Sequence, residues 1–193
     1  MKFKTSIEKD EINALEMLKF QGKIHLVTNA DEAIKIAKKL SNEEILGFDT
    51  ETRPSFKKGE TYDVSLLQLS TESDAYLFRL NKMTFPKELA QLLADPKIVK
   101  AGVAVRDDIK SLQKLSPFKD ENFCELQDFA KELGVKNFSL RALCAIFINY
   151  RLSKRAKITN WEQPTLTDAQ VQYAACDAWV GLQIYKQMKS VNS

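Results

Sequence analysis

The sequence predicts a mixed α/β fold in which helices cover the faces of one β-sheet. Three strand-like runs are spaced closely enough to form antiparallel hairpins, at 45–49, 64–69 and 75–78. A strand at 97–102 then follows a helical pattern and precedes a helix at 106–115, as in a β–α crossover. Hairpins and a crossover that feed one sheet give it both antiparallel and parallel neighbours.

The other elements follow from local signals in chain order. A helix is expected around residues 9–20, then a strand at 23–27, then a helix at about 31–40 that Thr28 or Asn29 can cap. The helix before the crossover strand is expected at about 86–94, from its apolar spacing. After the crossover the pattern predicts helices for the rest of the chain.

The C-terminal helix has the clearest signals. Thr167 and Gln170 form a capping box, in which the hydroxyl and the amide each satisfy a backbone N–H of the first turn. Nothing breaks the helix between Thr167 and about Lys189 except Gly181, for which we expect a role in close packing.

Composition and charge restrict the class of protein. The 193 residues fit one domain, predicted to span 1–193, and 44% hydrophobic with 28% charged residues is a globular balance. No apolar run approaches the roughly 20 residues that span a bilayer, and the N-terminus lacks signal-peptide features. The three cysteines form no CxxC pair and are expected to be reduced, in a cytoplasmic protein. The net charge of +3 permits a nucleic-acid partner but does not indicate one.

Two acidic residues stand at the end of an apolar strand. Asp49 and Glu51 are separated by one residue and therefore lie on one face of the strand. Adjacent carboxylates repel each other, but their proximity becomes favourable when they share a hard divalent cation. The alternative is a solvated strand end with two surface acids. The apolar lead-in at 45–48 weakens this alternative, because it indicates a central strand.

Two further acids lie on predicted helices. Asp108 lies where a helix begins, and taken alone it is best explained as a first-turn residue that stabilises the helix N-terminus. Asp177 follows Tyr173 by four residues, so their side chains share a helical face. A buried aspartate needs a partner, and a purely structural hydrogen bond from Tyr173 explains this pair as well as catalysis does.

Together the four acids meet the requirements of a two-metal phosphodiesterase. Such a site takes carboxylates from separate elements and holds two ions roughly 3.5–4 Å apart, which activate water and stabilise the leaving 3′ oxygen. The expected cofactor is Mg²⁺ or Mn²⁺, with two ions per site, because carboxylate oxygens suit hard cations.

Several motifs resemble those of a known family. They are FDTE at 48–51, AGVAVRDDIKSL at 101–112, SLRAL at 139–143, NW at 160–161 and LTDAQVQYAACDAWVGLQIY at 166–185. Over about residues 20–190 the chain resembles the DnaQ-like 3′–5′ exonucleases with four acidic residues and a tyrosine. Within this family it is most similar to the Werner-syndrome-protein exonuclease domain, and ribonuclease D is a more distant relative. The resemblance implies a ribonuclease-H-like fold with a five-stranded mixed sheet flanked by helices.

The resemblance also implies roles for five residues. Asp49, Glu51 and Asp177 would hold the first metal, and Asp49 would bridge to the second. Asp108 would act through water molecules on the metals. Tyr173 would orient the attacking water, because a phenol with a pKa of about 10 is a poor base at neutral pH.

Two details depend on how the motifs align. Histidine-type relatives place a histidine five residues before the final aspartate, and Gln172 occupies that position here. In the second motif, a slip of one residue would put Asp107 in the place of Asp108.

Substrate contacts are predicted from position near the acids. Thr50, Leu66 and Gln68 are candidates for contact with the terminal nucleotide, and Phe56 could flank the entrance for the 3′ end. Trp161 is expected to be a buried structural residue rather than a stacking platform. Each basic residue before Asn160 is best explained alone as part of a solvated loop, but as a group they could bind phosphates: Arg151, Lys154, Arg155 and Lys157.

The sequence therefore predicts a metal-dependent 3′–5′ exonuclease that releases nucleoside 5′-monophosphates. Its expected partner is a nucleic acid with a free 3′ end, with DNA favoured, and no membrane; no protein partner is indicated. One alternative is ribonuclease D-like trimming of RNA 3′ ends, for which an additional helical domain is expected beyond the last catalytic helix. The other is a catalytically silent nucleic-acid-binding module, which the complete acid set disfavours.

Overall fold

A mixed sheet forms the centre of the computed structural model, which describes residues 3–153, 156 and 158–192. Within these residues the sheet has six strands in the order β1-β4-β3-β2-β5-β6. The β2–β3 and β3–β4 pairs are antiparallel, whereas β1–β4, β2–β5 and β5–β6 are parallel. The strands are β1 (Lys23–Val27), β2 (Ile45–Thr52), β3 (Val64–Ser70), β4 (Asp74–Arg79), β5 (Val99–Gly102) and β6 (Phe123–Glu125).

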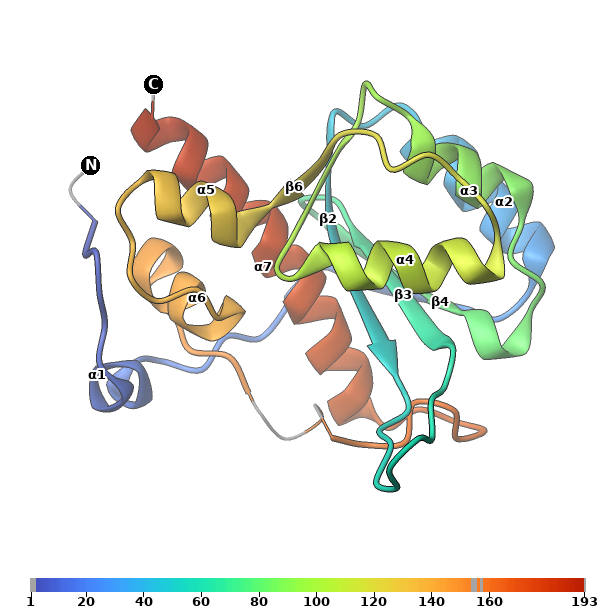
Figure 1. Cartoon of the computed structure of the whole chain (residues 1–193), viewed down its shortest axis with the longest axis horizontal. Helices are drawn as coiled ribbons and strands as arrows, with labels where there is room; N and C mark the ends of the chain where they lie inside the picture. The colour runs from blue at the N-terminus through green and yellow to red at the C-terminus, as the bar shows by residue number, and fades with distance from the viewer. Residues whose placement is uncertain (1–2, 154–155, 157, 193) are drawn as a thin grey trace.

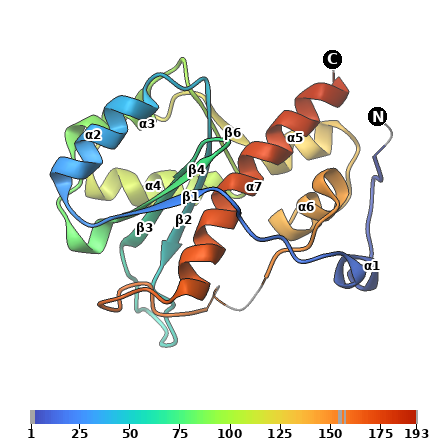
Figure 2. The same cartoon turned by 180° about the vertical axis from the view of Figure 1, so that it is seen from behind.

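Helices cover both faces of this sheet. Helix α4 crosses the face seen in Figure 1, on the side of α2 and α3, and α7 crosses the opposite face with α5 and α6 beside it (Figure 2). The helices are α1 (Lys9–Ala14), α2 (Ala30–Leu40), α3 (Lys87–Ala94), α4 (Val105–Leu115), α5 (Leu126–Glu132), α6 (Leu140–Ile148) and α7 (Asp168–Asn192), and a short 3₁₀ helix, η1, spans Leu80–Lys82. In the described part of the chain, no helix is both long and apolar enough to cross a bilayer.

The mixed sheet flanked by helices is confirmed, but it has six strands where the resemblance implies five. The prediction that helices follow the crossover is wrong at Phe123–Glu125, which forms β6. This three-residue segment pairs with β5 in the register Lys100↔Phe123. Three residues are too few to show an alternating pattern, so only the path of the chain beside β5 makes them a strand.

The N-terminal helix is shorter than predicted and ends at Ala14. The residues after it are held in an extended conformation by pairing with the segment around Arg151. The Leu18 N–H donates to the Arg151 carbonyl at 2.9 Å, and the Arg151 N–H donates to the Glu16 carbonyl at 2.9 Å. A pairing between residues so far apart in sequence overrides the local helical pattern.

Helix α7 begins as predicted. The Thr167 N–H donates to Gln170 Oε1 at 3.0 Å and the Gln170 N–H donates to Thr167 Oγ1 at 3.3 Å, which confirms the capping box. Asn29, one of the two predicted caps of α2, accepts from the Glu32 N–H at 2.9 Å.

Two glycines allow α7 to lie directly on the backbone of the sheet. A Cβ atom at Gly181 would lie 2.7 Å from the Ala101 carbonyl oxygen, and one at Gly47 would lie 1.9 Å from the Ala178 carbonyl oxygen. Both distances are shorter than van der Waals contact. The predicted role of Gly181 in close packing is therefore confirmed, with β5 as the element that it contacts.

We expect Gly181→Ala to lower the free energy of unfolding by about 1–3 kcal/mol, because the added methyl group overpacks the contact with Ala101. Helix propensity alone has the opposite sign, since alanine is favoured over glycine by about 1 kcal/mol. Urea unfolding measures the difference. Gln187→Ala, at an exposed position of the same helix, should change stability by less than about 0.5 kcal/mol. A Gly181→Ala protein as stable as the parent would contradict the close contact.

Candidate active site

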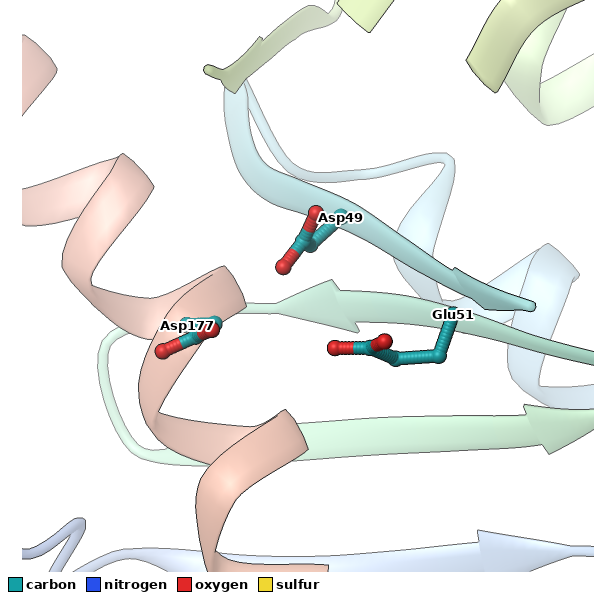
Figure 3. A group of neighbouring side chains, drawn as sticks. All are labelled: Asp49, Glu51 and Asp177. Atoms are coloured by element: carbon teal, nitrogen blue, oxygen red, sulfur yellow. The ribbon is translucent and has the colours of Figure 1, made fainter. Parts of the chain in front are cut away.

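Three carboxylates from two elements converge in one place. Asp49 and Glu51 lie on β2 on the side that faces α7, and Asp177 lies on α7. Figure 3 shows the three side chains directed toward a common space, and each offers an oxygen within 4.8 Å of the others. Strand alternation explains the pair on β2, because Gly47, which contacts Ala178 of α7, is on the same face.

The electrostatics of this cluster are unfavourable without a positive charge. Burial raises the pKa of Asp49 well above its usual range, and the nearby carboxylates of Asp177 and Glu51 raise it further. A hydrogen bond from the Thr50 N–H to Asp49 Oδ1, at 3.0 Å, opposes these effects only in part. Three crowded oxygen ligands of this kind fit a hard divalent cation, which would neutralise their repulsion.

Asp108 approaches the same strand end from the other face of the sheet. It lies in the first turn of α4, and Thr50 Oγ1 donates to its Oδ1 at 2.7 Å. Burial raises the pKa of Asp108 to about 6. Asp108 lies outside the cluster of three, although its charge contributes to the raised pKa of Asp49.

Asp107 points elsewhere. Its side chain is 93% exposed and forms an ion pair with Lys110 at 3.4 Å on the same helix. Of the two adjacent aspartates, Asp108 is therefore the one directed toward Thr50.

The start of α4 is held by a residue that sequence reasoning missed. Ala104 has φ 62°, in the left-handed region, just before the helix. The N–H groups of Ala104 and Val105 donate to the two carboxylate oxygens of Glu125, each at 2.9 Å. Glu125 thus fixes the turn from which Asp108 projects. No local signal links it to a turn about 20 positions earlier in the chain.

Tyr173 lies one helical turn before Asp177 and is half-buried. Burial raises its pKa, and so do the charges of Asp177 and Glu51 and a hydrogen bond to Asp177. The phenol therefore stays protonated at neutral pH and acts as a hydrogen-bond donor. Its ring packs against Trp161, with 6.1 Å between centroids, and Trp161 is 0% exposed, which confirms the prediction of a buried tryptophan.

A second residue that sequence reasoning missed holds the loop before α7. The Arg79 side chain, 1% exposed, donates to the carbonyls of Trp161, Gln163 and Pro164 at 3.3, 2.6 and 3.0 Å. These bonds fix the entry to α7 and, through Trp161, the wall beside Tyr173. A lone arginine at a strand end gives no sequence signal for such a role.

The three clustered acids, Asp49, Glu51 and Asp177, line one cleft of about 770 Å³ together with Tyr173. Arg141, from the SLRAL motif, lines it as well and is half-buried, with its guanidinium donating to Asn13 Oδ1 at 2.7 Å. The SLRAL motif is part of the family resemblance, but the sequence alone predicts no role for its arginine. Other lining residues include Ile12, Gln127, Ser139, Leu152, Ser153 and Ile158.

The predicted substrate contacts have different placements. Thr50 lines the cleft, whereas Leu66 and Gln68 are 0% exposed on the face of β3 that α7 covers. Arg151 donates to the Leu15 carbonyl at 2.8 Å, so its guanidinium ties the N-terminal segment in place.

The remaining predicted contacts are Phe56 and three members of the basic cluster. Phe56 is 82% exposed. Lys154, Arg155 and Lys157 lie outside the described residues.

Known proteins are similar to this chain in sequence or in fold. A sequence model of the 3′-5′ exonuclease family matches residues 24–192. The mouse (Mus musculus) bifunctional 3′-5′ exonuclease/ATP-dependent helicase WRN is 35% identical over 184 residues, which cover 90% of this chain. The Aedes aegypti Nibbler EXO domain superposes with a TM-score of 0.82 at 23% identity, covering 90% of this chain and 91% of that one.

Escherichia coli RNase D, described as an exoribonuclease involved in structured RNA processing, superposes with a TM-score of 0.78 at 19% identity, over 88% of this chain. Both structural likenesses concern the fold alone. The chain spans 13% of the mouse protein and 46% of RNase D.

We expect Mn²⁺ to raise the melting temperature, because it binds the folded cluster and relieves the carboxylate repulsion. Asp49→Asn should raise the melting temperature in EDTA, by about 2–4 °C for each kcal/mol gained, and should lose most of the Mn²⁺ effect. Differential scanning calorimetry measures both quantities. Asp107→Asn, which changes an exposed acid, should keep the Mn²⁺ effect. Equal Mn²⁺ shifts in the parent and Asp49→Asn would place the cation elsewhere.

Proposed function

Because the chain belongs to the 3′-5′ exonuclease family, we propose that it hydrolyses the terminal phosphodiester bond at the 3′ end of a nucleic acid and releases nucleoside 5′-monophosphates. The observation that carries this proposal is the convergence of the Asp49, Glu51 and Asp177 carboxylates beside Tyr173 in one cleft. Hydrolysis of a phosphodiester needs concentrated positive charge and an oriented water, and this constellation suits both needs.

The acids would hold two divalent cations, Mg²⁺ or Mn²⁺. Asp49, Glu51 and Asp177 would bind the first, and Asp49 with Asp108, through water, would bind the second. Bound cations would supply the charge that activates water and neutralises the leaving 3′ oxygen. Thr50 holds the Asp108 carboxylate in place by its 2.7 Å hydrogen bond.

Residues of the chain would orient the reactants. Tyr173, protonated at neutral pH, would turn its O–H from Asp177, which would then bind a cation, to the attacking water and align that water with the phosphorus. Arg141, which lines the same cleft, would bind a phosphate of the incoming strand. The water oxygen forms a bond to phosphorus, the bond from phosphorus to the 3′ oxygen breaks, and the phosphate leaves on the released nucleotide. One proton of the water passes to solvent, and the 3′ oxygen takes up a proton from solvent to become a hydroxyl.

We favour DNA as the substrate. The chain is 35% identical to the mouse exonuclease–helicase and 19% identical to the exoribonuclease RNase D. RNA trimming is the second candidate, favoured by the likeness of the fold to RNase D, with a TM-score of 0.78. Direct comparison of the two substrates decides between them.

With Mn²⁺ present, a 5′-labelled strand should give a descending ladder, whereas a 3′-labelled strand should release its label at once as a mononucleotide. Single-stranded and recessed-end DNA and RNA of matched sequence test the preference, and we expect faster release from DNA. Asp177→Asn, purified in the same way, controls for contaminating nucleases and should release nothing. Release of the 5′ label first would refute the polarity, and faster release from RNA would favour the second candidate.

Asp108→Asn should lower the rate of cleavage by about tenfold or more, as changes to groups that support a metal site do. Asp107→Asn is the matched control. It should leave the rate nearly unchanged and alter stability by about 0.3–1 kcal/mol, the range for a first-turn acid at a helix N-terminus. Single-turnover rates measure the effect on catalysis and urea unfolding measures the effect on stability. If Asp107→Asn were the slower enzyme, the two aspartates would have to exchange roles.

A further inference from the structure

Gln68 is a buried amide beside the acid cluster. It lies on β3 directly opposite Asp49 of β2, in the antiparallel register Asp49↔Gln68. Residues paired in this way project from the same face of a sheet, with Cβ atoms about 4.5–5.5 Å apart. Gln68 is 0% exposed, on the face of β3 that α7 contacts, so its side chain is fully buried.

Neither polar atom of this side chain has a hydrogen-bond partner within the residues that the structure describes. The amide nitrogen and the amide oxygen of Gln68 are both buried without a hydrogen bond to any of the described residues. A buried polar group that forms no hydrogen bond is costly, and native proteins keep few of them. Because an apolar residue of similar size would remove that cost, the amide needs an explanation beyond packing.

The neighbours of Gln68 on the sheet offer few polar groups to which its amide could form a hydrogen bond. Its cross-strand neighbour on β4 is Leu77. Leu66, two residues earlier on β3, lies on the same face. Both are apolar and 0% exposed. On the other side lies Ser70, opposite Gly47 and away from the acids. Across the sheet the nearest polar side chain in register is Asp49.

We propose that Gln68 is a positioning residue, whose side-chain N–H donates a hydrogen bond to the Asp49 carboxylate when the acid cluster binds a divalent cation. This role rests on the proposed function of the site. Asp49 would contribute to both proposed cation positions, so its orientation would matter more than that of the other acids. A donor on the neighbouring strand would hold the Asp49 carboxylate in one orientation, and metal sites commonly depend on such supporting bonds.

Mn²⁺ titration of the full chain by calorimetry, without nucleic acid, tests this role. In Gln68→Met and Gln68→Leu, which keep the side-chain volume approximately but remove the donor, the apparent dissociation constant for Mn²⁺ should rise about 10–100-fold. Their melting temperatures in EDTA should equal or exceed that of the parent, because the unpaired amide is gone. The Mn²⁺ concentration that gives half of the maximal cleavage rate should rise by the same factor. Excess Mn²⁺ should restore most of the rate.

Ser70→Ala is the matched control. Its hydroxyl is also buried with no hydrogen-bond partner in the described part of the chain, on the same strand and the same face, but it lies opposite Gly47 rather than an acid. It should bind Mn²⁺ like the parent. An unchanged Mn²⁺ affinity in both Gln68 variants would overturn the proposal, whatever their melting temperatures in EDTA.

The two proposals fail differently. A parent protein that binds Mn²⁺ but cleaves no nucleic acid would refute the proposed function, and the affinities of the Gln68 variants would still decide the role of Gln68. Two variants are needed so that a failure of one to fold leaves the other to be measured.

Discussion

The direct contact between α7 and the backbone of β2 is the constraint on which the site depends. Gly47 leaves no side chain between the strand and Ala178, and Gly181 does the same at β5. Because the helix rests on the strands themselves, Asp177 comes within reach of Asp49 and Glu51. A side chain at Gly47 would lift the helix, and the carboxylates would separate. Residues without chemistry of their own thus determine whether a cation site can form.

This close approach has an electrostatic cost that the rest of the fold must offset. Burial and the neighbouring acids raise the pKa of Asp49, and the Gln68 amide beside it has no hydrogen-bond partner among the described residues. Away from the acids, α7 buries Val180 and Ile184 against the sheet and the neighbouring helices. Burial of such side chains contributes about 1.5–3 kcal/mol each, enough to hold a locally unfavourable site in a folded protein. Helix α7 therefore contributes both an acid to the unfavourable cluster and the buried apolar side chains that offset its cost.

Sequence reasoning succeeded where the signal is local. The hairpin strands, the capping box of α7 and the buried Trp161 all follow from patterns within a few residues. It failed at β6, at the end of α1 and at Glu125 and Arg79, because there the partner lies far away in sequence. For the site, the acids could be identified, but the burial of Leu66 and Gln68 could not, since it depends on where α7 lies. Local patterns identify candidate residues, whereas packing determines which of them meet.

The register of β2 explains which acids meet. Odd-numbered residues at its end, Asp49 and Glu51, face α7, and the residue between them, Thr50, turns to α4 and donates to Asp108. A shift of one residue would exchange the two faces, sending both acids to α4 and the hydroxyl to Asp177. The chain has 26 acidic residues, so their number alone selects nothing. The geometry selects them: strand alternation divides three consecutive side chains between two helices, and the helical period directs Asp108, rather than Asp107, toward the strand.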